Sequence, residues 1–159
     1  MKFRTTILTV LLTSVSIVNP ITGAEPKAAM PKQSSNFNTP EETLQAYEQR
    51  LSRQSWDLVK DLIHEDAVFI FTESTFRGKE EIRQAFEKTF DLIKEEKYWL
   101  TNLNWVARTE SMVSCEYLFN WEGIIHGNPS SGGGRGSSVL IRTENGWKII
   151  QEHLGPPAK

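Results

Sequence analysis

Cysteine is almost absent from this sequence, which has one, Cys115, among 159 residues. A single cysteine cannot form an internal disulfide, so the hydrophobic core must hold the fold. Cys115 lies in the apolar segment MVSCEYLFNW. This context favours a buried thiol that packs as a small hydrophobic side chain over a reactive nucleophile.

The sequence also lacks an apolar run long enough to cross a bilayer. The run at residues 7–18, ILTVLLTSVSIV, is about 12 residues long, whereas a membrane-spanning helix needs about 20. Lys2 and Arg4 precede this run and small residues at 22–24 follow it, an order typical of a secretory signal peptide. We therefore expect residues 1–24 to be cleaved from a secreted or periplasmic protein with no other membrane association. An uncleaved anchor is the alternative.

Positive charge is in slight deficit, with 18 Lys and Arg against 20 Asp and Glu. Residues 1–24 contain two of the basic residues and no acidic one, so the mature chain has a net charge of −4. Its basic residues are scattered and form no stripe, which argues against nucleic acid as a partner.

Motifs of several common catalytic centres are missing. His64, His126 and His153 are the only histidines, and they are too far apart to form a local metal-ligand motif. The stretch SSGGGRG lacks the Gly-Lys-Ser/Thr ending of a phosphate-binding loop. No Gly-x-Ser-x-Gly elbow of a serine hydrolase occurs. We therefore expect no metal and no cofactor.

Helical patterns begin after a polar, proline-containing stretch at residues 25–38, which predicts a flexible leader. In TPEETLQAYEQRLSRQ, Thr39 is an N-cap, Pro40 suits the first helical position and Glu42 completes a capping box. SWDLVKDLIHEDA predicts a shorter helix capped by Ser55, followed by a buried strand, AVFIF. KEEIRQAFEKTFDLIKEE, residues 79–96, has the apolar stripe of a third helix.

The period of the apolar residues then changes from 3.6 to 2. YWLTNLNWVAR and SMVSCEYLFNWEGII predict long strands. By composition, HGNPSSGGGRG at residues 126–136 is a mobile loop that could cover a pocket. SSVLIRTENGWKIIQEHL predicts a hairpin that turns at Asn145-Gly146. This order predicts one α+β domain, with helices on one face of a curved, mainly antiparallel sheet.

The closing segment GRGSSVLIRTENGWKIIQEHLG resembles the end of SnoaL-like domains of the nuclear transport factor 2-like superfamily. AYEQRLSRQSWDLVKDLIHEDAVF and FRGKEEIRQAF resemble the helices and first strand of the same superfamily, so the resemblance covers residues 39–155 and leaves 156–159 as a tail. It implies a cone-shaped α+β barrel, with three N-terminal helices, an apolar pocket and a homodimer. Because the superfamily includes enzymes, ligand binders and oligomerising domains, the resemblance does not define an activity.

Ketosteroid isomerases share this fold and use a tyrosine, a protonated carboxylic acid and a carboxylate base. Tyr47 falls at the position of their tyrosine, but Phe71 falls at the position of the base. The strand RGSSVLIR, which matches the one carrying their second acid, has no acid. Steroid isomerisation by that mechanism is therefore not expected. Glu73 is a candidate substitute base, because it keeps the strand parity of Phe71.

The last strand ends with Glu152 and His153, two groups able to transfer protons. Strict alternation places His153 on the face of Trp147 and Ile149, and Glu152 on the face of Ile150. Alternation does not decide which face lines the pocket. The structural alternatives are a strand-end hydrogen bond for His153 and a solvated charge for Glu152.

Further candidate ligand contacts come from an arginine and several aromatic residues. Arg135 falls on the predicted face of Glu152 and could bind a carboxylate or enolate oxygen. Its structural alternative is an ion pair with Glu152 or Glu122. The aromatic candidates, which could equally fill the core, are Trp56, Phe71, Trp105, Tyr117 and Trp121.

These residues favour an exported protein that binds a small, largely apolar molecule. If it is an enzyme, we expect cofactor-free acid–base chemistry, as in an isomerase, cyclase or hydratase. His153 or Glu152 would transfer the proton, while Tyr47 and Arg135 would stabilise an oxyanion. The alternative is a binding or association module without chemistry.

Overall fold

The structure, a computed structural model, describes residues 37–158. The predicted signal peptide and nearly all of the predicted leader lie outside these residues. The elements are α1 (Pro40–Leu51), α2 (Trp56–Val59), the short 3-10 helix η1 (Lys60–Leu62), β1 (Ile63–Phe71), β2 (Ser74–Arg77), α3 (Gly78–Leu92), β3 (Ile93–Arg108), β4 (Met112–Ile125), β5 (Asn128–Thr143) and β6 (Gly146–Gly155).

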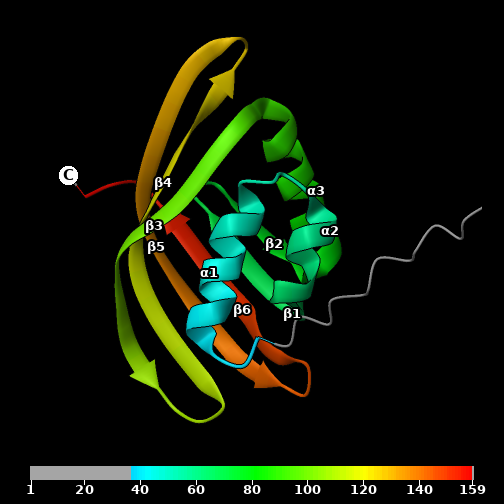
Figure 1. The fold of residues 1–159 in the computed structure, drawn as a ribbon, viewed down its shortest axis with the longest axis vertical. Helices are drawn as coiled ribbons and strands as arrows, with labels where there is room; N and C mark the ends of the chain where they lie inside the picture. Colours follow the sequence, from blue (N-terminus) through cyan, green and yellow to red (C-terminus); the bar gives the residue numbers. More distant parts are fainter. Residues whose placement is uncertain (1–36, 159) are drawn as a thin grey trace, which may run out of the picture. The chain divides into compact units, whose positions relative to one another are not determined.

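The six strands form one sheet in the order β2-β1-β6-β5-β4-β3. All neighbouring pairs are antiparallel except β1 with β6, which is parallel. Within residues 37–158 no pairing joins β2 to β3, so the curved sheet is open. Figure 1 shows the three α-helices gathered on one side of this sheet. The predicted α+β fold is confirmed.

The predicted capping box begins α1. The Thr39 side chain accepts a hydrogen bond from the Glu42 amide at 3.2 Å, and a Glu42 carboxylate oxygen accepts one from the Thr39 amide at 3.3 Å. The predicted apolar face of α1 is buried and includes Tyr47, which is 1% exposed. This face packs toward β3 and β6, so α1 carries Tyr47 to the centre of the sheet. No helix in residues 37–158 has the length and apolar character required to cross a membrane.

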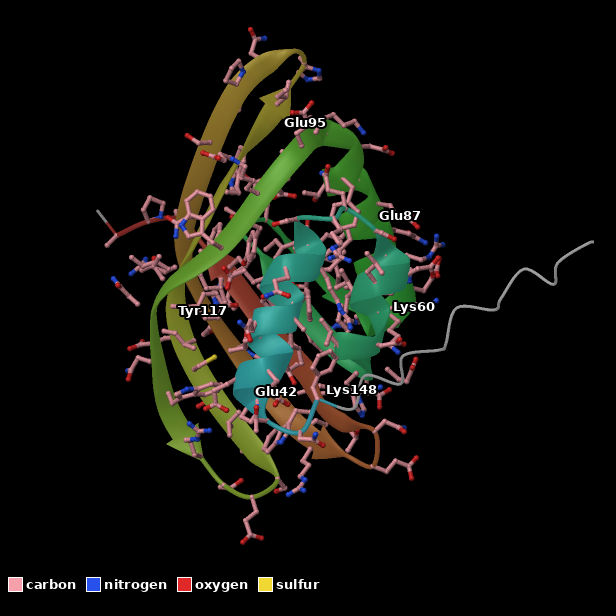
Figure 2. The ribbon with its side chains drawn as sticks, in the orientation of Figure 1. Glu42, Lys60, Glu87, Glu95, Tyr117 and Lys148 are labelled. Carbon is pink, nitrogen blue, oxygen red and sulfur yellow. The ribbon has the colours of Figure 1, made fainter. Side chains whose placement is uncertain are left out.

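The third helix is shorter than predicted, because α3 ends at Leu92 and β3 begins at Ile93. Glu95, labelled in Figure 2 at the start of β3, has a positive φ of 54°. The register of β3 with β4 shifts between Lys94 and Lys97. A bulge of this kind redirects the side chains that follow it. Its effect is to turn Glu96 inward, so that this carboxyl is buried.

The predicted loop at residues 126–136 is wrong, because the chain turns at His126–Gly127 and β5 begins at Asn128. Glycines on the inner face of β5 lie opposite aromatic rings of β4, as at Gly132 with Trp121 and Gly136 with Tyr117. A Cβ on Gly132 would lie 2.7 Å from the Trp121 indole nitrogen. The glycines that make this segment look like a loop therefore allow aromatic rings of β4 to pack closely over β5.

Gly136→Ala is expected to lower the free energy of unfolding by about 1–3 kcal/mol, as overpacking does elsewhere. The added methyl group would collide with the Tyr117 ring. Urea denaturation measures the change. Ser137→Ala, on the other face of β5, is the matched control and is expected to change stability by less than about 0.5 kcal/mol. Equal effects of the two substitutions would contradict this packing.

Candidate functional site

A cavity of about 180 Å³ lies between the helices and the inner face of the sheet. Side chains from α1, α3, β1, β3, β4 and β6 line it. Most of its wall is apolar, as in many small-molecule sites. The apolar contacts include Leu51, Phe71, Phe86, Phe90, Phe119 and Trp121, and the polar groups include Tyr47, Glu96, Tyr98 and Glu152.

Glu152 is the central polar group and is 0% exposed. The Tyr47 hydroxyl donates to its Oε2 at 2.8 Å, and the Tyr117 hydroxyl donates to its Oε1 at 2.9 Å. The Tyr117 oxygen in turn lies 2.8 Å from Ser138 Oγ. Each carboxylate oxygen has two lone-pair directions, so both oxygens can be held by tyrosines and still accept a proton from the cavity.

Burial raises the pKa of Glu152 to about 7, while the hydrogen bonds from the two tyrosines oppose the shift. Burial, followed by the nearby Glu152 charge, raises the pKa values of Tyr47 and Tyr117 well above their ordinary value. The tyrosines therefore remain protonated donors near neutral pH. A carboxyl with a pKa near 7 both accepts and returns a proton readily under these conditions.

Alternation along β6 is broken beside Glu152. Leu140 pairs with Ile149 and Val139 pairs with Gln151, which leaves Ile150 as an extra residue. The predicted division of faces is therefore wrong beyond Ile149. Glu152 shares the buried face with Ile149 rather than lying opposite it. The structural alternative for Glu152, a solvated charge, is also wrong.

Glu96 is a second buried carboxyl at the cavity, and sequence reasoning missed it. Its side chain is 7% exposed. Burial alone raises its pKa to about 7. Within residues 37–158 no side-chain hydrogen bond or ion pair holds this carboxyl. The bulge at Glu95 turns Glu96 inward, but the sequence does not indicate it, since the segment KEE is typical of a helix end.

Tyr98, two residues further along β3, was also missed. Its ring stacks on Phe119 with the centroids 6.5 Å apart and meets the Tyr47 ring edge-on at 6.4 Å. The Tyr98 hydroxyl is buried and has no hydrogen-bond partner in the described part of the chain.

Five sequence candidates lie at this site. Tyr47, Phe71, Trp121 and Glu152 line the cavity, and Tyr117 holds Glu152. Their proposed chemical roles stay predictions.

Phe71 and Glu73, the two residues related to the isomerase base, lie at the end of β1 and just after it. At Phe71, where the base of that mechanism falls, the cavity wall is apolar. The strand ends there, so Glu73 lies in an exposed turn and does not line the cavity.

Two polar candidates lie elsewhere. His153 is exposed and pairs with Ser137 on the outer face of the sheet. Arg135 is also exposed, and its Nε donates to the Pro156 carbonyl oxygen at 3.3 Å. The ion pairs suggested for Arg135 are not formed, because Glu152 is held by tyrosines and Glu122 pairs with Lys97 at 2.8 Å.

Two of the aromatic candidates, Trp56 and Trp105, also lie outside the cavity. Trp56 packs edge-on against Phe86 with the ring centroids 5.9 Å apart. Trp105 lies under the Arg108 guanidinium, whose carbon is 4.7 Å from the centroid of the ring. Both are half-buried supports of the fold in this structure.

The cysteine and the histidines take no part in the cavity. Cys115 is buried, as predicted, and burial raises the pKa of its thiol to about 11. A thiol of this kind is a poor nucleophile near neutral pH. Among residues 37–158 no three His, Cys, Asp or Glu side chains are grouped to hold a metal ion.

Comparison with known proteins agrees with this architecture. Residues 41–159 match the family model of the SnoaL-like domain. A search of curated protein sequences finds no match. A candidate aromatic ring hydroxylase from Novosphingobium aromaticivorans is similar in structure, with a TM-score of 0.69 and 24% identity over 75% of this chain and 87% of that one.

Two further solved structures differ in what their names suggest. A candidate dehydratase of the nuclear transport factor 2-like family from Streptomyces avermitilis has a TM-score of 0.67 and 14% identity, over 74% of this chain and 92% of that one. A candidate calcium/calmodulin-dependent protein kinase II association domain from Xanthomonas campestris has a TM-score of 0.63 and 18% identity, over 87% and 100%. At these identities the likeness concerns the fold alone.

Proposed function

The chain belongs to the SnoaL-like domain family, and we propose that it binds a small, largely apolar molecule in the cavity and exchanges a proton with it through Glu152. The observation that carries this proposal is the fully buried Glu152 carboxyl at the cavity wall, held by Tyr47 and Tyr117. Burying a carboxyl costs stability unless it is well compensated. Its position at a cavity is therefore more consistent with chemistry than with packing.

The reaction class is cofactor-free acid–base catalysis, such as isomerisation, cyclisation or dehydration. Glu152 would take a proton from a carbon of the bound molecule and return it to another atom. The hydrogen bonds from Tyr47 and Tyr117 would hold the carboxylate in one orientation toward the bound molecule. The apolar walls would exclude water, which strengthens the electrostatic interactions inside the cavity.

Two measurements test binding in the cavity. Native mass spectrometry of the protein purified from its own host should reveal a retained small molecule that is lost on denaturation. With acetophenone as the probe, NMR titration should detect binding to the wild type and its loss in Thr89→Phe, which adds a ring to the cavity wall. Lys88→Phe adds the same ring at the exposed neighbouring position and should bind normally. Equal binding by both variants would place the probe elsewhere.

A second candidate function is association of two copies through the outer face of the sheet, without chemistry. Trp99 on β3 is 36% exposed and Leu118 on β4 is 38% exposed. They are diagonal neighbours, since Trp99 pairs with Asn120 and Thr101 pairs with Leu118. The similarity to a candidate association domain also supports this reading. Light scattering should detect a dimer that Leu118→Arg weakens, and a monomeric wild type would contradict it.

Export is also part of the proposal, and its support is the three-part pattern of residues 1–24. The protein recovered from the periplasm or medium of its host is expected to begin near Glu25. Intact mass measurement checks this directly. A version without residues 2–24 should remain in the cytoplasm. Recovery of the uncleaved chain in the membrane fraction would instead favour an anchor.

A further inference from the structure

The Tyr98 hydroxyl is a hydrogen-bond donor without an acceptor. Tyr98 is 8% exposed and lines the cavity, and its hydroxyl has no partner in residues 37–158. Buried polar groups almost always have a partner. An unpaired donor at a cavity wall therefore points to an acceptor that enters the cavity.

The position of this donor is fixed from two sides. The ring packs between Phe119 and Tyr47. The backbone is tied to the C-cap of α1, because the Tyr98 amide donates to Ser52 Oγ at 3.0 Å. The ring cannot turn away to find another acceptor, so the hydroxyl keeps one place at the cavity wall.

The neighbouring polar groups define what the acceptor can be. Glu96 lies two residues before Tyr98 on the inner side of β3 and also lines the cavity without a partner. Burial first, and then the charges of Glu152 and Glu96, raise the pKa of Tyr98 well above its ordinary value. Tyr98 is therefore a donor throughout the neutral range. Glu96 and Glu152, whose charges both act on Tyr98, line the same cavity.

We propose that Tyr98 determines specificity by donating a hydrogen bond to a carbonyl or hydroxyl oxygen of a ligand no larger than one substituted ring. This inference rests on the proposed function, because it concerns the molecule bound beside Glu152. The size follows from the volume of about 180 Å³, since a cavity of about 150 Å³ holds benzene. A hydroxyl would accept from Tyr98 and donate to ionised Glu96, whereas a carbonyl would only accept.

Three probes of one size test the proposal: ethylbenzene, acetophenone and 1-phenylethanol. Their dissociation constants are measured by NMR or calorimetry for the wild type and for Tyr98→Phe, which removes only the unpaired oxygen. The ratio of the ethylbenzene constant to that of each oxygenated probe reports the preference for oxygen. In the comparison of two variants the different hydration of the probes cancels.

The preference for at least one oxygenated probe is expected to fall about tenfold in Tyr98→Phe, as for loss of one hydrogen bond. The probe that loses more identifies the carbonyl or the hydroxyl as the recognised group. Unchanged ratios for both probes, in a variant that still binds ethylbenzene, would overturn the proposal. Failure of the wild type to bind any probe would overturn it together with cavity binding.

Glu152→Gln separates the two proposals. It should keep the oxygen preference within about threefold, since the Tyr98 donor remains, while it slows proton exchange by about 10²–10⁴-fold. Loss of the preference in Glu152→Gln but not in Tyr98→Phe would assign recognition of the oxygen to Glu152 and overturn the role of Tyr98. Preserved recognition without any proton exchange in the wild type would instead remove the acid–base function alone.

Discussion

Glu152→Gln is expected to slow proton exchange with a bound ketone by about 10²–10⁴-fold, the usual contribution of a positioned acid or base. Glutamine keeps the shape of the side chain and can still hydrogen-bond Tyr47 and Tyr117. It cannot take a proton at neutral pH. The substitution therefore removes the proposed chemistry while it keeps the cavity.

Deuterium incorporation into the methyl group of acetophenone, followed by NMR in D₂O near neutral pH, measures this exchange. The wild type should accelerate it over buffer. Glu116→Gln, an exposed carboxylate on the outer side of β4, is the matched control and should retain full activity. If the wild type exchanged deuterium into small ketones no faster than buffer does, the result would favour association of two copies without chemistry.

The exchange assay also decides between Glu152 and His153. Sequence reasoning proposed both as proton-transfer groups, and the structure leaves only Glu152 at the cavity. His153→Gln should therefore exchange protons at the wild-type rate. A large loss of the exchange rate in His153→Gln, with the rate kept in Glu152→Gln, would place the chemistry on the outer face of the sheet.

Much of the fold was predictable because local signals agree with the tertiary structure. The capping box at Thr39 and Glu42 begins α1, and the alternating apolar residues of β4 place Cys115 and Tyr117 inside. These patterns depend on periods of 3.6 and 2, which local geometry imposes on any buried helix or strand. Tyr47 was accessible to the same reasoning, because it lies on the apolar face of α1.

The site was harder to predict because single-residue irregularities create it. An extra residue at Ile150 reverses the alternation of β6 and turns Glu152 inward. The bulge at Glu95 does the same for Glu96. A shift of one residue exchanges the two faces of a strand, and no local propensity specifies such a shift. The glycines of β5 were misread because their partners are rings on another strand.

Stability is expected to fall as the pH rises from about 5 to 8, because two buried carboxyls bind protons more tightly in the folded protein. Burial raises the pKa of Glu152 from 4.5 to about 7, and that of Glu96 also to about 7. Below the pKa of the unfolded chain, both carboxyls are protonated in the folded and the unfolded state, so their ionisation does not affect stability. Between 4.5 and 7 the unfolded chain ionises first, so unfolding becomes easier. Above pH 7 the carboxyls are ionised in both states, and the folded protein bears the full free-energy cost of burying their charges.

For Glu152 the cost is on the order of 3 kcal/mol, since one pKa unit corresponds to about 1.4 kcal/mol. The exposed Glu80 carboxylate acts in the opposite direction, but its pKa is lowered to about 2 by Arg83. The stability that it contributes is lost only at much lower pH, as it becomes protonated. The window from pH 5 to 8 therefore reports mainly on the buried carboxyls.

Urea denaturation of the wild type, Glu152→Gln and Glu116→Gln between pH 5 and 8 measures this dependence. Glu152→Gln should flatten the profile and be more stable than the wild type at pH 8, whereas Glu116→Gln should keep the wild-type slope. A wild type whose stability rises across this window would contradict the raised pKa of Glu152. A carboxyl that weakens the fold at neutral pH, beside a cavity, is what selection for proton transfer rather than for stability would retain.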